Sequence, residues 1–414
     1  MKIKIKCPSI IKGEIEISGS KNACLPVIAA SLLSKEEITL YNVPLITDVI
    51  SMIRILDDLG VSVNYNYVES KLVIRANRIK KDLDSCFVSK LRASYYLISP
   101  LIHRKNNFAT LYPGGCNFGK RPIDFHLKLY KQMGLDITEK EKIYFKKRKL
   151  RPINYTFSTV TVGGTINAIL STVLIKGKTT LSNIAIEPEV IDVIHFLQSM
   201  GAKIQFIDKR SIVIEGVKEL HKTTYSIMPD RIEAGSYMFL AMAKPHSQIK
   251  INKVNVSHLE NVIEVINKLG GEITIINDSV EIKSPENIKN INISTGPYPY
   301  FPTDLQPILS TVLLNGNDTS KINETIYPSR NSHIKELSKM KASIEMNQGL
   351  ITINPSPLIS GMVQANDLRC GFAMIVAGVI SGKQIIINQA EYIFRGYDDI
   401  MGKLCKIGIK CKKE

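Results

Sequence analysis

Residues 196–204 read FLQSMGAKI, in which the end of an amphipathic helix is followed by Gly201 and then by a short alternating strand. The same phrase recurs as ILDDLGVSV at 55–63, LYKQMGLDI at 129–137, VINKLGGEI at 265–273, ELSKMKASI at 336–344 and KLCKIGIKC at 403–411. Successive copies lie 67 to 74 residues apart, which predicts six structural repeats of one kind. Five copies have glycine where a helix commonly ends in the left-handed conformation. The other has Lys341, which must adopt a costlier conformation or end its helix differently.

A second phrase recurs in phase with the first: an apolar, alanine-rich helix that opens with polar or charged residues. Its copies are KNACLPVIAASLL at 21–33, LRASYYLISPLI at 91–102, GTINAILSTVLI at 164–175, DRIEAGSYMFLAMA at 230–243, TDLQPILSTVLL at 303–314 and DLRCGFAMIVAGVI at 367–380. Helices that are apolar nearly all round are expected to be buried. Since one repeat cannot cover such a helix alone, the repeats must pack around them, and we expect an α/β fold with two globular domains of three repeats each.

The starts of these buried helices carry charges that bear on function. The residues in question are Lys21 and Asn22, Arg92, Thr165, Asp230 and Arg231, Asp304, and Asp367 and Arg369. A helix N-terminus favours anions, and an acidic residue there is explained by capping. Lys21, Arg92 and Arg369 have the wrong sign for a first turn, so we expect a negatively charged ligand near these helix ends.

The composition is that of a folded intracellular protein. Of the 414 residues, 44% are hydrophobic and 22% charged, and seven scattered cysteines form no CxxC pair. This pattern argues against a disulfide framework or a zinc site and favours a reducing compartment. No apolar run approaches the roughly 18 residues of a membrane span. The opening MKIKIKCPSI is typical of a strand rather than of a signal peptide, so we expect a cytoplasmic protein.

The formal charge of +16 leaves two interpretations open, a nucleic-acid partner or a small anionic substrate. The tightest basic run, KKRKLR at 146–151, is short, and no RNP-type aromatic motif or helix-turn-helix signature accompanies it. We therefore favour small anionic substrates and expect no nucleic-acid, membrane or protein partner.

Seven motifs together resemble the UDP-N-acetylglucosamine enolpyruvyl transferases, also called UDP-N-acetylglucosamine 1-carboxyvinyltransferases. They are SGSKNACLP at 18–26, YPGGCNFGKRPIDFHL at 112–127, EPEVIDVIHFLQSMGA at 187–202, PDRIEAGSY at 229–237, FPTDLQP at 301–307, NDLRCGF at 366–372 and FRGYDDI at 394–400. The resemblance implies two domains of three repeats each, both inside-out α/β barrels with buried helices. It implies one domain at 1–20 plus 230–414 and another at 21–229, the latter with a lid loop at 112–121.

The resemblance also implies an activity. Enzymes of this family transfer the enolpyruvyl group of phosphoenolpyruvate to the 3′-hydroxyl of UDP-N-acetylglucosamine and release phosphate, the first committed step of peptidoglycan synthesis. Neither a metal nor an organic cofactor is implied. Two alternatives stay open, a 5-enolpyruvylshikimate-3-phosphate synthase and a degenerate nucleotide-sugar-binding paralogue. Cys116 and the pair Lys21-Asn22 argue against the first, whereas Pro328 and Phe394, which depart from the family's usual pattern, keep the second open.

The resemblance assigns four residues to catalysis. Cys116 matches the catalytic acid of the lid, and its neighbours Lys120 and Arg121 would lower the pKa of the thiol. Asp304 matches the base that takes the hydroxyl proton. Lys21 and Arg395, together with Arg121, match the phosphoenolpyruvate clamp. The alternatives without a catalytic role are a buried structural cysteine for Cys116 and a helix cap for Asp304.

The substrate-binding positions implied by the resemblance are Asn22, Arg92, Arg121, Pro122, Ile123, Asp124, Phe125, Thr161, Val162, Gly163, Ile326, Arg330, Asp367 and Arg369. For Arg330 and Arg369 a structural salt bridge between domains is the rival interpretation. His126 has no metal partner in the sequence, so we expect it to pack or to form hydrogen bonds. Thr159 and Asn331 are further departures, which put affinity and hinge behaviour in question more than reaction type.

Overall fold

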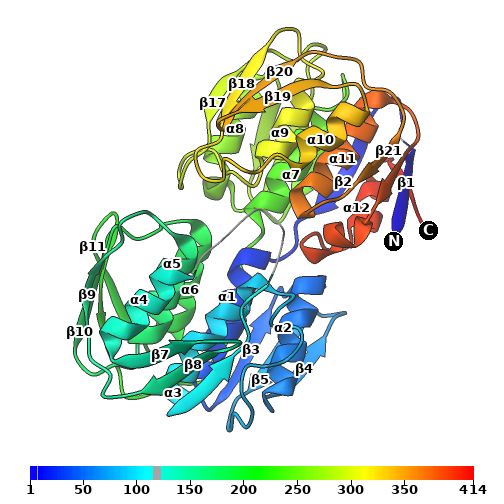
Figure 1. The fold of residues 1–414 in the computed structure, drawn as a ribbon. Coiled ribbons are helices and arrows are strands. Elements are labelled where there is room, and N and C mark those ends of the chain that lie inside the picture. Colours follow the sequence, from blue (N-terminus) through cyan, green and yellow to red (C-terminus); the bar gives the residue numbers. More distant parts are fainter. Residues whose placement is uncertain (7, 115–122) are drawn as a thin grey trace. The chain divides into compact units, whose positions relative to one another are not determined.

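The computed structural model describes residues 1–6, 8–114 and 123–414, and these fall into two compact units (Figure 1). Unit 1 comprises Met1–Ser18 and Pro229–Glu414, and unit 2 comprises Gly19–Met228. The chain thus passes from one unit to the other twice, at 18–19 and at 228–229. Within the described ranges, none of the helices has both the length and the apolar character that a membrane span requires.

The described residues of unit 2 include three buried and three amphipathic helical elements. The buried ones are α1 (Lys21–Ala30) with η1 (Ser31–Leu33), η2 (Arg92–Leu97) with α3 (Ile98–Arg104), and α5 (Val162–Thr172). The amphipathic ones are α2 (Thr47–Asp58), α4 (Asp124–Met133) and α6 (Pro188–Ser199).

Unit 1 repeats this arrangement. Its buried helices are α7 (Arg231–Ala241), α9 (Gln306–Leu313) and α11 (Leu368–Ser381). The amphipathic ones are α8 (Glu260–Lys268), α10 (Ser332–Lys339) and α12 (Ile400–Lys406), and η3 (Val256–His258) and η4 (Ala390–Arg395) are short 3₁₀ turns.

Small sheets surround the helices, and each sheet takes most of its strands from one repeat. In unit 2 the strand orders are β13 (Thr223–Ser226), β3 (Glu37–Tyr41), β5 (Lys71–Arg75), β4 (Ser62–Asn66); then β6 (Asn107–Thr110), β8 (Ile143–Lys147), β7 (Leu135–Glu139); then β11 (Lys203–Asp208), β12 (Ser211–Glu215), β10 (Lys178–Ser182), β9 (Asn154–Thr156). In the three-stranded sheet a parallel bridge between Leu83 and Thr110 lies where the other sheets have a fourth strand.

The part of unit 1 that the structure describes forms three four-stranded sheets. Their orders are β21 (Met362–Gln364), β22 (Ile385–Asn388), β1 (Lys2–Lys6), β23 (Lys410–Lys413); then β15 (Glu272–Ile276), β16 (Ser279–Lys283), β14 (Gln248–Asn252), β2 (Lys12–Glu16); then β17 (Asn292–Ser294), β18 (Ser320–Asn323), β20 (Leu350–Asn354), β19 (Ser343–Asn347).

Strand exchange explains why unit 1 is discontinuous. The strand β2, which precedes α1, pairs in parallel with β14 of unit 1, with Ile15 opposite Ile251. The strand β13, which precedes α7, pairs in parallel with β3 of unit 2, with Tyr225 opposite Leu40. Each strand therefore lies in one unit while the buried helix that follows it lies in the other, and the chain must cross at both points.

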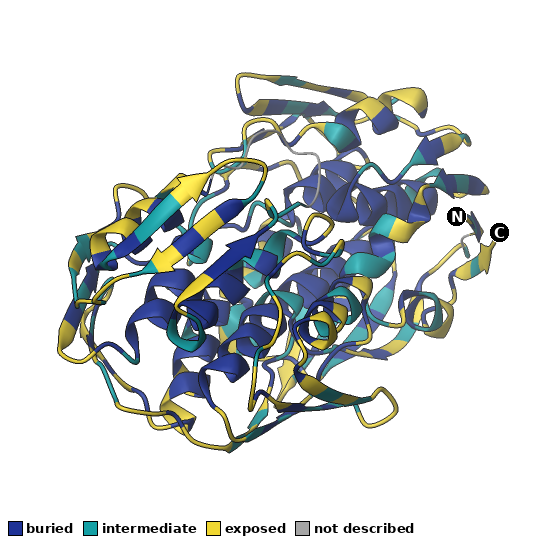
Figure 2. Cartoon of the chain, turned by 60° about the horizontal axis from the view of Figure 1, so that its bottom comes forward, coloured by how far each residue is buried: buried dark blue, intermediate teal, exposed yellow. Residues whose placement is uncertain are grey.

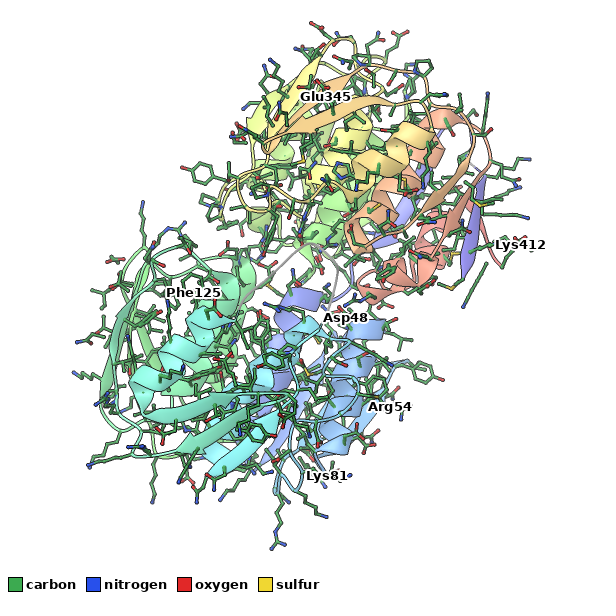
Figure 3. The ribbon with its side chains drawn as sticks, viewed as in Figure 1. Asp48, Arg54, Lys81, Phe125, Glu345 and Lys412 are labelled. Carbon is green, nitrogen blue, oxygen red and sulfur yellow. The ribbon has the colours of Figure 1, made fainter. Side chains whose placement is uncertain are left out.

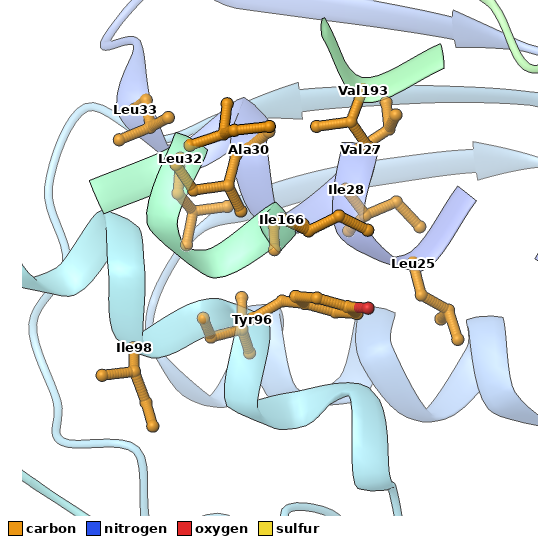
Figure 4. Packing of buried hydrophobic residues seen from close by; sticks show 14 of the residues in the cluster. Leu25, Val27, Ile28, Ala30, Leu32, Leu33, Tyr96, Ile98, Ile166 and Val193 are labelled. Atoms are coloured by element: carbon orange, nitrogen blue, oxygen red, sulfur yellow. The ribbon is translucent and has the colours of Figure 1, made fainter. Parts of the chain in front are cut away.

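Each unit has its own hydrophobic core, made of the buried helices and the inner faces of the strands. Figure 2 shows the inner helices as buried and the exposed residues along the outer strands. Strand β5 shows the alternation: Leu72 and Ile74 are fully buried between half-buried or exposed neighbours. In the core of unit 2, Val27 and Ile28 of α1 pack with Ile166 of α5 and Val193 of α6 (Figure 4).

The predicted repeat period and the buried helices are confirmed. All five repeat glycines have positive φ, and Lys341 adopts the same left-handed conformation with φ of 65°. For a residue with a Cβ atom this conformation costs about 1 kcal/mol.

The expected starts of three buried helices were wrong. α5 begins at Val162, not Thr165, because Thr161 caps it through a hydrogen bond from the Gly164 amide to its Oγ1 (3.3 Å). Arg92 opens the 3₁₀ segment η2, and α3 starts only at Ile98, which places Pro100 in the first turn, where no amide hydrogen is needed. Asp304 lies two residues before α9.

Candidate functional site

In unit 1, Asp304 lies between two arginines from different segments. Arg330 Nη1 is 2.8 Å from Asp304 Oδ1, and Arg369 Nη2 is 2.9 Å from Asp304 Oδ2. Arg330 Nη1 also donates to the Thr303 carbonyl oxygen at 2.7 Å. The Asp304 side chain is 26% exposed, whereas Arg330 and Arg369 are 3% and 6% exposed, so the carboxylate is the accessible member of the group.

These contacts bear on the alternatives for three predicted site residues. Asp304 is not the cap residue of α9, because that position is Leu305, which makes no side-chain capping hydrogen bond. Arg330 and Arg369 do form salt bridges, and both pairs lie inside unit 1.

The charges set the ionisation of Asp304. Burial raises the pKa of this carboxyl, but the guanidinium groups of Arg369 and Arg330 outweigh burial and hold its pKa well below the usual range. Burial in turn lowers the pKa of Arg369, and the charge of Asp304 more than compensates, so that it is raised. Asp304 is therefore ionised at neutral pH, the form that can accept a proton, although its proton affinity is low.

Asp367 caps the N-terminus of α11, where Arg369 lies in the first turn. Its Oδ1 accepts the amide hydrogens of Arg369 (2.9 Å) and Cys370 (3.0 Å), and its Oδ2 accepts a hydrogen bond from Ser332 Oγ. A cation in the first turn of a helix is ordinarily unfavourable. The capping carboxylate and Asp304 offset that cost, so specific contacts within unit 1 stabilise Arg369 in the first turn of α11.

In unit 2, the start of α1 presents Lys21 and Asn22. Ser20 caps this helix, and its Oγ accepts the Ala23 amide at 3.4 Å. Lys21 Nζ is 3.6 Å from Oδ2 of Asp48, a buried residue in the first turn of α2 (Figure 3). Asp48 was not among the predicted site residues, although its signal in the sequence is an acidic residue in the first turn of a predicted helix.

A second group in unit 2 brings Arg92, Tyr95, His126 and Gly163 together. The Arg92 guanidinium lies over the Tyr95 ring, 5.6 Å from its centroid, and the Tyr95 and His126 rings are 4.9 Å apart. A Cβ at Gly163 would lie 2.4 Å from Tyr95 Oη, so any larger residue there would displace the Tyr95 side chain. Burial first, and then the charge of Arg92, lower the pKa of His126 to about 4, which keeps this imidazole neutral and fits the expected packing role.

The remaining binding positions are spread over several elements. Ile123 is buried before α4, Asp124 is exposed at its start, and Phe125 is half-buried in its first turn (Figure 3). Thr161 and Val162 are half-buried at the start of α5. In unit 1, Ile326 and Arg395 are half-buried, the latter at the end of η4. Cys116, Arg121 and Pro122 lie outside the described residues, as does Lys120.

Glu324, which sequence reasoning missed, organises the segment around Ile326. Its Oε1 accepts the amides of Ile326 (2.9 Å) and Tyr327 (2.8 Å) and the Thr295 hydroxyl (3.0 Å), while its Oε2 accepts the Thr303 hydroxyl at 2.9 Å. Glu324 is 1% exposed. One buried carboxylate thus connects the residue before Asp304 to the segment that leads to Arg330.

The structure therefore brings Asp304, Arg330, Arg369 and the capping Asp367 together in unit 1. In unit 2 it brings Arg92 and Gly163 together around Tyr95, and it pairs Lys21 with Asp48. Within the described residues, no group of three or more His, Cys, Asp or Glu side chains could hold a metal ion.

Comparison with known proteins places this geometry in a family. The family model for EPSP synthase (3-phosphoshikimate 1-carboxyvinyltransferase) matches residues 5–404. The UDP-N-acetylglucosamine 1-carboxyvinyltransferase of Thermotoga maritima is 36% identical over 99% of this chain and 98% of its own length. The corresponding Clostridium botulinum protein is 40% identical, and UDP-N-acetylglucosamine 1-carboxyvinyltransferase 2 of Streptococcus mutans is 39% identical, each over 98% of both chains.

Solved structures support the fold. The enolpyruvyl transferase NikO from Streptomyces tendae has a TM-score of 0.90 at 19% identity, covering 99% of this chain and 98% of that one. An EPSP synthase from Acinetobacter baumannii has a TM-score of 0.78 at 16% identity, with both chains fully covered. The two-domain inside-out α/β barrel expected from the resemblance agrees with these likenesses.

Proposed function

Because the chain belongs to the family of UDP-N-acetylglucosamine 1-carboxyvinyltransferases, we propose that it transfers the enolpyruvyl group of phosphoenolpyruvate to the 3′-hydroxyl of UDP-N-acetylglucosamine and releases phosphate. This would be the first committed step of peptidoglycan synthesis, carried out in the cytoplasm. The observation that carries the proposal is 36–40% identity over nearly the full length of the curated relatives. A 5-enolpyruvylshikimate-3-phosphate synthase fits less well, because these relatives are named for UDP-N-acetylglucosamine.

In the proposed addition step, the sugar oxygen forms a bond to C2 of phosphoenolpyruvate. The hydroxyl proton leaves to Asp304, and C3 takes a proton from Cys116. In the elimination step, the C2–O bond to phosphate breaks, phosphate leaves with the bonding electrons, and C3 returns a proton to the Cys116 thiolate, which restores the C2–C3 double bond. Only proton transfers and one group transfer are required, so we propose that the enzyme works without a cofactor and with two small-molecule substrates as its partners.

The ion pairs of Asp304 suggest how its low proton affinity could be overcome. The acceptor substrate brings two phosphate groups, which can compete for the charges of Arg330 and Arg369. Any weakening of those pairs raises the proton affinity of Asp304 when the acceptor hydroxyl is present. We propose that the carboxylate becomes an effective base only in the substrate complex.

Lys21, Arg121 and Arg395 are proposed to hold the phosphate and carboxylate of phosphoenolpyruvate. Arginine can bind either group in a bidentate manner, and lysine supplies a point charge. The segments 121–125 and 161–163, together with Ile326, are proposed to contact the uridine nucleotide. Asn22, Arg92, Asp367 and Arg369 complete the proposed site.

Phosphate release from phosphoenolpyruvate tests the proposal, with UDP-N-acetylglucosamine and shikimate 3-phosphate as alternative acceptors. We expect release with the nucleotide sugar alone. Release with shikimate 3-phosphate would reassign the acceptor. Binding of UDP-N-acetylglucosamine without any release would favour a degenerate binding protein and overturn the catalytic proposal.

A further inference from the structure

We propose that Tyr397 is a positioning residue that holds Arg369 in place and, through it, orients Asp304. This inference rests on the proposed function, because it gives Tyr397 a part in the same reaction. Tyr397 lies two residues after Arg395 in the FRGY segment and is not among the predicted site residues. Its side chain is 1% exposed, so it acts from beneath the site rather than by touching substrate.

The evidence is an unbroken series of contacts. Arg369 Nη1 donates to Tyr397 Oη at 3.2 Å, and Arg369 Nη2 donates to Asp304 Oδ2 at 2.9 Å. The Arg369 guanidinium also lies over the Tyr397 ring, with Cζ 5.6 Å from the centroid. The guanidinium is thus fixed at both of its terminal nitrogens, and its plane is restrained by an aromatic face.

The direction of the hydrogen bonds can be deduced beyond Tyr397. Ser236 Oγ lies 2.6 Å from the Ile232 carbonyl oxygen and 2.9 Å from Tyr397 Oη. The carbonyl can only accept, so the single Ser236 hydroxyl proton is used there. Tyr397 must therefore donate to Ser236 Oγ, which leaves its oxygen lone pairs free to accept from Arg369. Every member is satisfied, and such a series of bonds is mutually strengthening.

Packing fixes the Tyr397 ring itself. Its centroid is 4.6 Å from that of Phe372, which lies on α11 three residues after Arg369. Phe372 in turn contacts Tyr237 of α7, with 5.4 Å between centroids. The hydroxyl of Tyr397 is therefore held in one place relative to α11, as a positioning group requires.

Tyr237 offers a matched control. It is a fully buried tyrosine of the same aromatic cluster, and its hydroxyl has no hydrogen-bond partner within the described residues. Tyr237→Phe and Tyr397→Phe each remove one tyrosine hydroxyl group from the same aromatic cluster. Only the second removes a contact to Arg369.

The test compares kcat, KM and the pH profile of phosphate release for wild type, Tyr397→Phe and Tyr237→Phe. A hydrogen bond to a charged group is lost in Tyr397→Phe, so we expect kcat to fall about 10- to 100-fold with little change in KM for phosphoenolpyruvate. Tyr237→Phe should keep wild-type kinetics. Equal kinetics in wild type and in folded Tyr397→Phe would overturn the inference.

The acidic limb of the profile gives a readout that a purely structural role would not move. The charged and titratable groups around Asp304 are Arg330 and Arg369, and those around the arginines are Tyr397, Asp230 and His333. A less restrained Arg369 stabilises the Asp304 anion less. The limb should therefore move to higher pH in Tyr397→Phe and stay in place in Tyr237→Phe.

Two further measurements test the role of Tyr397 if Tyr397→Phe does not fold or if the wild type is inactive. If Tyr397→Phe does not fold, Ser236→Ala removes the acceptor of the Tyr397 hydroxyl proton instead. This variant should lower kcat and move the acidic limb of the pH profile to higher pH. Wild-type kinetics in Ser236→Ala would then refute the positioning role of Tyr397. If the wild type transfers nothing, the proposed function fails. The inference is then tested by NMR of the Arg369 side chain, assigned with Arg369→Lys. Unchanged Arg369 signals in Tyr397→Phe would refute it independently.

Discussion

Replacing Glu324 by Gln is the most informative perturbation of the unit 1 framework. Glu324 accepts four hydrogen bonds, two of them from the amides of Ile326 and Tyr327. A glutamine can keep its oxygen toward those amides and turn its NH₂ group toward the Thr303 hydroxyl, which can accept instead of donating. The shape is preserved and the charge is lost.

The magnitude follows from the number of charge-assisted bonds. Charge-assisted hydrogen bonds contribute about 1.5–3 kcal/mol and neutral ones about 1 kcal/mol. Loss of charge in several bonds, partly offset by cheaper burial of a neutral amide, should lower the unfolding free energy by about 1–3 kcal/mol. Because Glu324 positions both Ile326 and Thr303, acceptor affinity and kcat should fall together.

Urea denaturation and calorimetric titration with UDP-N-acetylglucosamine measure the two effects. Glu336→Gln is the control: Glu336 is 4% exposed and lies in the same unit. It accepts the Gln364 amide at 2.9 Å and the Asn366 side-chain amide at 3.1 Å, and it pairs with Lys339 at 2.7 Å, but it contacts neither Ile326 nor Thr303. The control variant should cost stability and leave acceptor affinity unchanged. If Glu324→Gln loses stability but binds the nucleotide sugar as the wild type does, the positioning argument for Glu324 is refuted.

Three further predictions concern other parts of the chain. Burial raises the pKa of Asp192 to about 6, so the folded state binds an extra proton and gains stability as pH falls from about 6 toward 4. Asp192→Asn should therefore be more stable than wild type at pH 7.5 by about 1–3 kcal/mol, and this difference should shrink by pH 5. A difference in unfolding free energy that stays constant with pH in urea denaturation would contradict this prediction. Lys341→Gly should raise the unfolding free energy by about 1 kcal/mol, since glycine adopts the observed φ of 65° without strain, and a loss of stability on denaturation would count against the assignment. An anionic epoxide that mimics phosphoenolpyruvate, such as fosfomycin, should alkylate Cys116; peptide mass spectrometry should find the adduct there and none in Cys116→Ala, and modification elsewhere would refute the role.

The repeats were predictable because their signals are local. A glycine at a helix end and an apolar helix are each encoded within about ten residues, so their period and their burial could be predicted. Lys341 shows that the period constrains the backbone even where the residue type departs from it. The helix starts at Val162 and Ile98 were missed because capping by Thr161 and the position of Pro100 outweigh the hydrophobic pattern.

The contacts of the candidate site were not predictable in the same way. Asp304 meets Arg369 across 65 residues of sequence, and Tyr397 meets Ser236 across 161. Glu324 and Asp48 are of residue types that usually lie at the surface, and their burial could not be predicted without the fold. The resemblance supplied Asp304 and Arg369 as separate positions, while their pairing and its effect on the pKa of Asp304 come from the structure.

Identifying the product formed from phosphoenolpyruvate and UDP-N-acetylglucosamine, by mass spectrometry and NMR, is the decisive test of enolpyruvyl transfer. We expect a 3′-enolpyruvyl ether of the nucleotide sugar, with one phosphate released for each ether formed. Phosphate release with the nucleotide sugar recovered unchanged, or an ether at another hydroxyl, would contradict it.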